Sequence, residues 1–85
     1  MNQQLTLEQR RSRGTEAKEL LDNPMIKAAF EAMATECLRQ WRAATDTEKR
    51  EQAWYRLQAV DEIERQFRRY ITDGMFAAKQ IEQAQ

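Results

Sequence analysis

The chain contains no histidine, a single cysteine, one proline and two glycines in 85 residues. Without histidine it lacks the commonest general base and the commonest metal ligand of proteins. The lone Cys37 cannot form a disulfide within the chain, which fits a reducing compartment. One cysteine and no histidine also exclude a structural zinc site built by one chain. Gly14 and Gly74 are too few for a phosphate-binding loop. We therefore expect no enzyme, no cofactor, no metal ion and no small-molecule substrate.

Long apolar runs are missing as well. No stretch of about 18 apolar residues is present, so we expect no membrane-spanning segment. The N-terminal residues do not resemble a secretory signal, which predicts a cytoplasmic location. Leu, Ile, Val and Phe supply only 14 of the 85 residues. A single domain of this length and composition has a thin core, and partner chains are expected to complete it.

Charge of one sign is not in excess, because 14 basic residues balance 14 acidic ones. Nucleic-acid-binding domains normally carry a basic excess. On the longest predicted helix, an acidic residue precedes a basic one by four positions at three places, which stabilises a solvated helix surface. These pairs are Asp46–Arg50, Asp61–Arg65 and Glu64–Arg68.

Good helix formers dominate the chain, and its few breaks mark the helix ends. Asn23-Pro24 predicts a helix start, since Asn is a strong N-cap and Pro is favoured at the first helical position. This helix is expected over 24–43. Thr45 and Glu48 match a capping box, so the next helix is expected over 46–73. Gly74 stands where a glycine would end that helix.

The sequence therefore predicts an all-α fold. Its centre is an antiparallel helical hairpin of about 24–43 and 46–73, because so short a connection forces two amphipathic helices side by side. A short N-terminal helix over 15–22, or a second copy of the chain, would cover the far end of the longer helix. We expect residues 15–85 to form one helical domain.

Two alternatives stay open for the polar residues 1–14. Thr6 and Gln9 match a capping box, so a helix could begin there. Equally, residues 1–14 could form a mobile arm that becomes helical near Thr15.

The main functional hypothesis is association through apolar side chains that the hairpin does not cover. Those expected to mediate it are Trp54, Phe67, Tyr70, Ile71 and Phe76. Trp41 and Trp54 flank the hairpin turn, where they would form either an aromatic plug or an exposed contact for a partner. Cys37 lies on an apolar stripe and is expected to be a buried small hydrophobe.

The alternative hypothesis is a nucleic-acid-binding accessory protein, used in packaging or regulation. Arg10, Arg11 and Arg13 form the short basic cluster that would contact phosphate. A third hypothesis is an inhibitor that docks one helix face into the groove of a target.

The layout of the chain resembles a group of small helical proteins from tailed bacteriophages, often found among head and packaging genes. The resemblance spans roughly residues 13–79. It rests on Arg13-Gly14, the LL pair at 20–21, Asn23-Pro24, the segment TDTEKREQAW, and Asp73-Gly74 followed by Ala77-Ala78. It implies a virion or assembly role, as a homo-oligomer or docked on a larger virion protein, in the host cytoplasm and the virion. It brings no catalytic motif and no functional residue.

Overall fold

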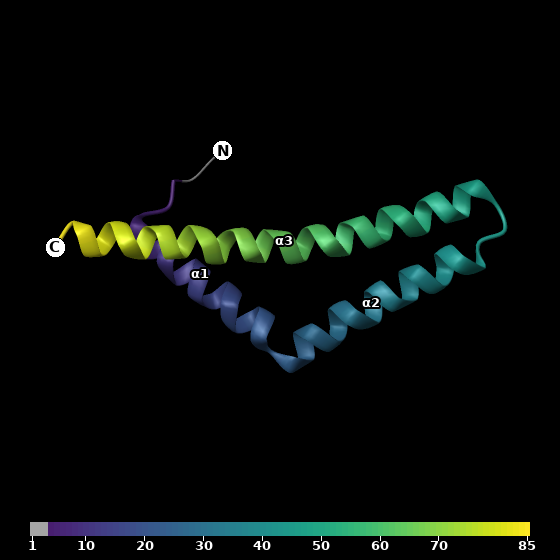
Figure 1. Ribbon diagram of the computed structural model, residues 1–85, viewed down its shortest axis with the longest axis horizontal. Coiled ribbons are helices and arrows are strands. Elements are labelled where there is room, and N and C mark those ends of the chain that lie inside the picture. Colours follow the sequence, from purple (N-terminus) through teal and green to yellow (C-terminus); the bar gives the residue numbers. More distant parts are fainter. Residues whose placement is uncertain (1–3) are drawn as a thin grey trace.

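A computed structural model describes residues 4–85, and within them the chain forms three α-helices and no strand. They are α1 (Leu7–Asp22), α2 (Pro24–Ala43) and α3 (Thr47–Gln83). The predicted all-α fold is confirmed. Figure 1 shows α1 and α2 as two sides of a triangle whose third side is α3, with α2 and α3 running in opposite directions. None of the helices in residues 4–85 is long and apolar enough to cross a bilayer.

Local capping chemistry determines where α2 and α3 begin. The Asn23 side chain accepts hydrogen bonds from the backbone N–H groups of Met25 (2.8 Å) and Ile26 (3.4 Å), as its place before Pro24 predicts. For α3 the predicted Thr45–Glu48 capping box is wrong. Asp46 is the N-cap and accepts from the Lys49 N–H at 2.8 Å. Carboxylate and hydroxyl oxygens compete for this role, and the acid is also favoured by the helix dipole.

The start of α1 resolves the two alternatives for the N-terminal segment. Thr6 accepts from the Gln9 N–H at 3.1 Å, and the Gln9 side chain accepts from the Thr6 N–H at 2.9 Å. This reciprocal capping box begins the helix at Leu7. A separate arm extending to residue 14 is therefore wrong for residues 7–14, which belong to α1 together with residues 15–22. The part of the predicted arm at residues 1–3 lies outside the described residues.

The largest departure from expectation is at Gly74, which does not end α3. The helix continues through it to Gln83, and Gly74 is buried. A Cβ atom built on Gly14 would lie 2.9 Å from the Gly74 Cα and 2.8 Å from the Tyr70 carbonyl oxygen. Gly74 is thus needed for the close crossing of α1 and α3, and Ala17 and Ala77 are buried one turn further along the two helices.

The molecule is thin and its core is made of small side chains. It measures 61 by 31 by 17 Å. Its radius of gyration is 17.4 Å, against about 12 Å for a compact domain of this length. The buried apolar residues are Ala17, Cys37, Ala53, Val60 and Ala77. The burial of Cys37 confirms its predicted place, but no large side chain within residues 4–85 is fully buried.

Candidate protein-interaction surface

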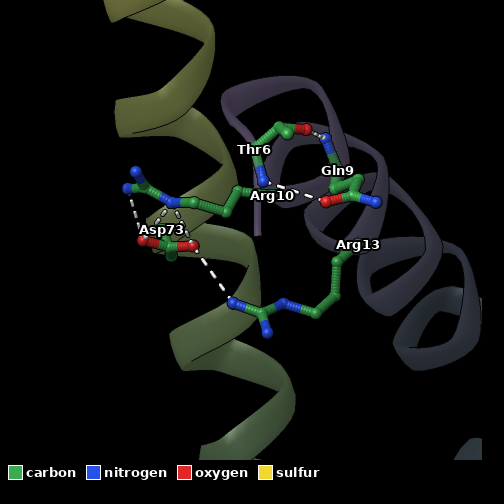
Figure 2. A network of polar contacts seen from close by, with 5 residues as sticks. All are labelled: Thr6, Gln9, Arg10, Arg13 and Asp73. Atoms are coloured by element: carbon green, nitrogen blue, oxygen red, sulfur yellow. Dashed lines mark hydrogen bonds and ion pairs between the residues drawn. The ribbon is translucent and has the colours of Figure 1, made fainter. Parts of the chain in front are cut away.

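A clamp of two arginines on one carboxylate holds α1 against α3. Arg10 donates from Nε to both oxygens of Asp73 (3.1 and 3.0 Å) and from Nη2 to Oδ1 (2.7 Å). Arg13 donates from Nη2 to the other oxygen, Oδ2, at 3.2 Å. Figure 2 shows both side chains reaching from α1 to Asp73 on α3. The clamp lies beside the Gly14–Gly74 crossing, so it adds polar contacts where the two helices approach closely.

The clamp changes the acidity of its members. Hydrogen bonds from Arg10, and then its charge and the contact with Arg13, hold the pKa of Asp73 below its ordinary value, although partial burial acts in the opposite direction. The same hydrogen bond raises the pKa of Arg10. Both groups are therefore charged at neutral pH, and the ion pair is intact there.

The basic cluster proposed for nucleic acid is engaged within the chain. Arg10 and Arg13 contact Asp73, and Arg13 also lies over the Tyr70 ring, with 4.2 Å between its Cζ and the ring centroid. Arg11 pairs with Glu8 at 2.5 Å. A contact with phosphate would have to compete with these partners, so the three arginines do not form a free basic arm.

Three of the five side chains expected to mediate association are partly covered by the chain itself. Phe67 packs edge to face with Phe30, with ring centroids 6.5 Å apart. Tyr70 lies beneath Arg13. Ile71 lines a groove between the three helices. Helix α1 covers the end of α3 that α2 does not reach, which is the role proposed for the N-terminal helix.

The other two side chains expected to mediate association, Trp54 and Phe76, are exposed on α3. Trp54 is 50% exposed and Phe76 is 61% exposed. Trp41 and Trp54 do not form a closed plug, since Trp41 is also exposed and has Arg50 over its ring at 5.9 Å from the centroid. Trp54 and Phe76 are large aromatic groups of the kind enriched at the centres of protein interfaces. Aromatic surface is therefore exposed toward both ends of α3.

Comparison with known proteins adds no relative. The chain matches no family model, no curated protein and no solved structure.

Two of the three predicted charge pairs are present on α3 at longer distances. Asp61 lies 3.9 Å from Arg65, and Glu64 lies 3.9 Å from Arg68. The third pair is replaced, because Asp46 caps the helix and Arg50 donates instead to the Ala44 carbonyl oxygen at 3.3 Å. A closer pair that sequence spacing did not suggest joins Arg69 to Glu62 at 2.7 Å.

The sequence did not point to a second set of exposed apolar side chains, which includes one residue on each helix. Leu20, Met33 and Ile63 are all exposed. The apolar stripes of α2 and α3 are wider than the contacts between the helices, so Met33 and Ile63 remain exposed at their margins. The stripe width was the available signal, since an apolar arc broader than one neighbour can cover leaves an exposed margin.

No cluster of three or more potential metal-ligating side chains occurs within residues 4–85. A groove of about 420 Å³ lies between the three helices. Leu21, Phe30 and Ile71 form its apolar lining. Six charged side chains also line it: Lys18, Asp22, Lys27, Glu31, Glu64 and Arg68. Positive and negative groups alternate around this groove, which we call the charged groove.

Proposed function

We propose that the protein is a non-enzymatic helical interaction module, which works by burying exposed apolar side chains against another protein surface. The single observation that carries this proposal is that small side chains are buried while large apolar side chains are exposed. Within residues 4–85, alanine, cysteine and valine fill the core, while ten large apolar side chains, Trp54 and Phe76 among them, are exposed. Folded chains rarely leave so much large apolar surface open without a partner.

The surface area supports the same conclusion. The chain exposes 6949 Å², whereas a compact monomer of 10.1 kDa is expected to expose roughly 5,300 Å². The excess of about 1,600 Å² is twice the area of roughly 800 Å² that each partner contributes to a standard interface. Association with one partner is thus enough to bring the exposed surface toward that of an ordinary folded protein.

The setting we propose is virion assembly in a tailed bacteriophage, in the host cytoplasm or the virion. This part of the proposal rests on the sequence layout described above. Its test is the genomic neighbourhood. Portal, terminase or capsid genes beside the gene for this chain are expected, and a neighbourhood of unrelated metabolic genes would remove this setting without affecting the interaction module.

The interaction module itself is tested by site-specific photo-crosslinking in the cells that naturally produce the protein. A crosslinking amino acid replaces Trp54 or Phe76 in the full chain, and we expect a discrete adduct from at least one position. Arg42, an exposed charged residue on α2, is the matched control position and should give a weaker adduct or none.

The adduct mass identifies the kind of partner. An adduct of twice the chain mass indicates a second copy, and a heavier one indicates a larger protein; either supports the module. Absence of any adduct above the Arg42 control, at both aromatic positions and in cells that produce the chain in normal amounts, would contradict it.

A further inference from the structure

Three of the exposed apolar residues, Leu20, Met33 and Ile63, lie on one face of the molecule. Residues seven apart in a helix project in nearly the same direction. Leu20 is seven residues after Arg13, and Ile63 is seven residues before Tyr70. Arg13 and Tyr70 are stacked on each other, so Leu20 and Ile63 lie on the same side of the α1–α3 pair.

Met33 belongs to that side as well. It lines a shallow groove between α2 and α3 together with Gln40 and Arg56. Arg56 donates to the Gln40 side chain at 3.0 Å across this groove. Ile63 is seven residues after Arg56, so it projects from the same side of α3 as the groove. We call this side the apolar face, defined by Leu20, Met33 and Ile63.

The opposite side of the molecule has a different chemistry. Lys18 and Asp22 of α1 and Lys27 and Glu31 of α2 line the charged groove there. Lys18 and Asp22 each stand two positions from Leu20, and Glu31 stands two positions from Met33. Two positions correspond to roughly half a helical turn. The charged groove therefore lies on the other flank of α1 and α2 from Leu20 and Met33.

We infer that the apolar face is a homodimer interface, on which a second copy of this chain packs face to face. The inference rests on the proposed function and names a second copy of the chain as the partner of the interaction module. Domains normally consist of two packed layers of secondary structure, whereas this chain is only 17 Å thick. A second copy laid on the apolar face supplies the missing layer and buries Leu20, Met33 and Ile63 in a shared core.

Area and charge both favour a second copy as the occupant. The excess exposed surface of each chain, about 1,600 Å², exceeds the roughly 800 Å² that each member of a standard dimer must bury. The formal net charge of zero removes long-range repulsion between identical chains. In a two-fold interface the same patch contributes to both sides. The groove on the apolar face carries both Glu36 and Arg56, so the acidic group of one copy can face the basic group of the other.

The test measures oligomeric state by sedimentation velocity on the full chain. Over about 1 to 100 μM protein, the concentration range that populates ordinary homodimers, we expect twice the chain mass of 10.1 kDa. Leu20→Lys places one ammonium group per copy in the interface, and we expect the dimer Kd to rise about 100-fold. Leu38→Lys is the matched control, because Leu38 and Leu20 are both 41% exposed and lysine is a good helix former at either site. The control Kd should stay within about threefold of the unsubstituted value.

A second pair of variants keeps the inference testable if Leu20→Lys fails to fold. In a Cys37→Ala background, Met33→Cys should be bridged to a second copy by a short bis-maleimide, whereas Leu38→Cys should not. The inference is overturned by a chain that stays monomeric at the highest concentration, or by dimers that Leu38→Lys weakens and Leu20→Lys does not. A monomer that still gives a heavier adduct at Trp54 or Phe76 would overturn the homodimer and leave the interaction module standing.

Discussion

Gly14 of α1 and Gly74 of α3 meet so closely that a Cβ atom on either residue would lie 2.9 Å from the Cα of the other. Real Cβ atoms do not approach backbone atoms to that distance, and backbone cannot move aside as a flexible side chain can. Both residues have ordinary helical conformations without positive φ. The need for glycine at both positions is therefore steric, and it arises from the neighbouring helix.

Replacing either glycine by alanine should destabilise the fold. In an isolated helix the change would stabilise by about 1 kcal/mol. Here the methyl group must push the helices apart, and overpacking of this kind costs roughly 1–3 kcal/mol. We expect Gly14→Ala and Gly74→Ala each to lower the midpoint of thermal unfolding. The midpoint is measured from the loss of the helical circular dichroism signal at 222 nm on heating.

The matched control for the glycine variants is Ser12→Ala. Ser12 is exposed on the same helix, so alanine there should be neutral or slightly stabilising. If Gly14→Ala raised the midpoint as Ser12→Ala does, helix propensity would dominate and the close crossing would be wrong.

The glycine pair also explains which parts of the fold could be predicted from sequence. The starts of α1 and α2 follow from local capping chemistry, because Thr6 with Gln9 and Asn23 with Pro24 act on residues within one turn. Gly74 was wrongly expected to end α3, since a glycine after an amphipathic run is typical of a helix terminus. Its contact is Gly14, 60 positions earlier in the chain, and no local sequence pattern reveals a contact between residues so far apart.

A weak signal for the crossing was nevertheless present. Gly14 and Ala17, and Gly74 and Ala77, repeat the same spacing of two small residues one turn apart, and such pairs allow helix backbones to approach closely. The clamp on Asp73 was not predictable in the same way. The arginines of α1 were interpreted as a basic cluster because the sequence does not show that the carboxylate lies opposite them once the helices cross.

The clamp itself should show energetic coupling between its members. We expect Arg10→Gln and Asp73→Asn each to lower stability, and the double variant to lose less than the sum of the two losses, because the second change removes an interaction already broken. The measurement is a double-mutant cycle by urea denaturation. Arg39→Gln with Asp73→Asn is the matched control cycle, since Arg39 pairs with Glu36 on α2 and should add independently. Strict additivity in the Arg10–Asp73 cycle would show that these two residues are not coupled in the folded chain.

Stability should fall in acid through Asp73. The pKa of this carboxyl is lowered in the folded chain, chiefly by the hydrogen bonds from Arg10. The unfolded chain therefore binds a proton at a higher pH than the folded one. The contribution of Asp73 is complete above the ordinary aspartate pKa and is lost as the pH falls through the lowered folded value.

Denaturation as a function of pH checks the sign of this effect. Asp73→Asn should have a shallower loss of stability in the acid range than the unsubstituted chain. Glu36 and Glu62 also have lowered pKa values, through hydrogen bonds from Arg39 and Arg69, so some acid dependence should remain in the variant. Identical acid profiles for the two proteins would contradict an ion pair at Asp73.

The turn at Asn23 should be sensitive to loss of its cap. Its side chain satisfies the first N–H groups of α2 at Met25 and Ile26, and this turn also sets the angle between α1 and α2. Asn23→Ala should cost about 1 kcal/mol of unfolding free energy, whereas Asn23→Asp, which keeps an acceptor oxygen, should cost much less. Urea denaturation of both variants measures the difference. Equal losses for the two substitutions would mean that the acceptor oxygen does not stabilise α2, and that the break before Pro24 depends on the proline alone.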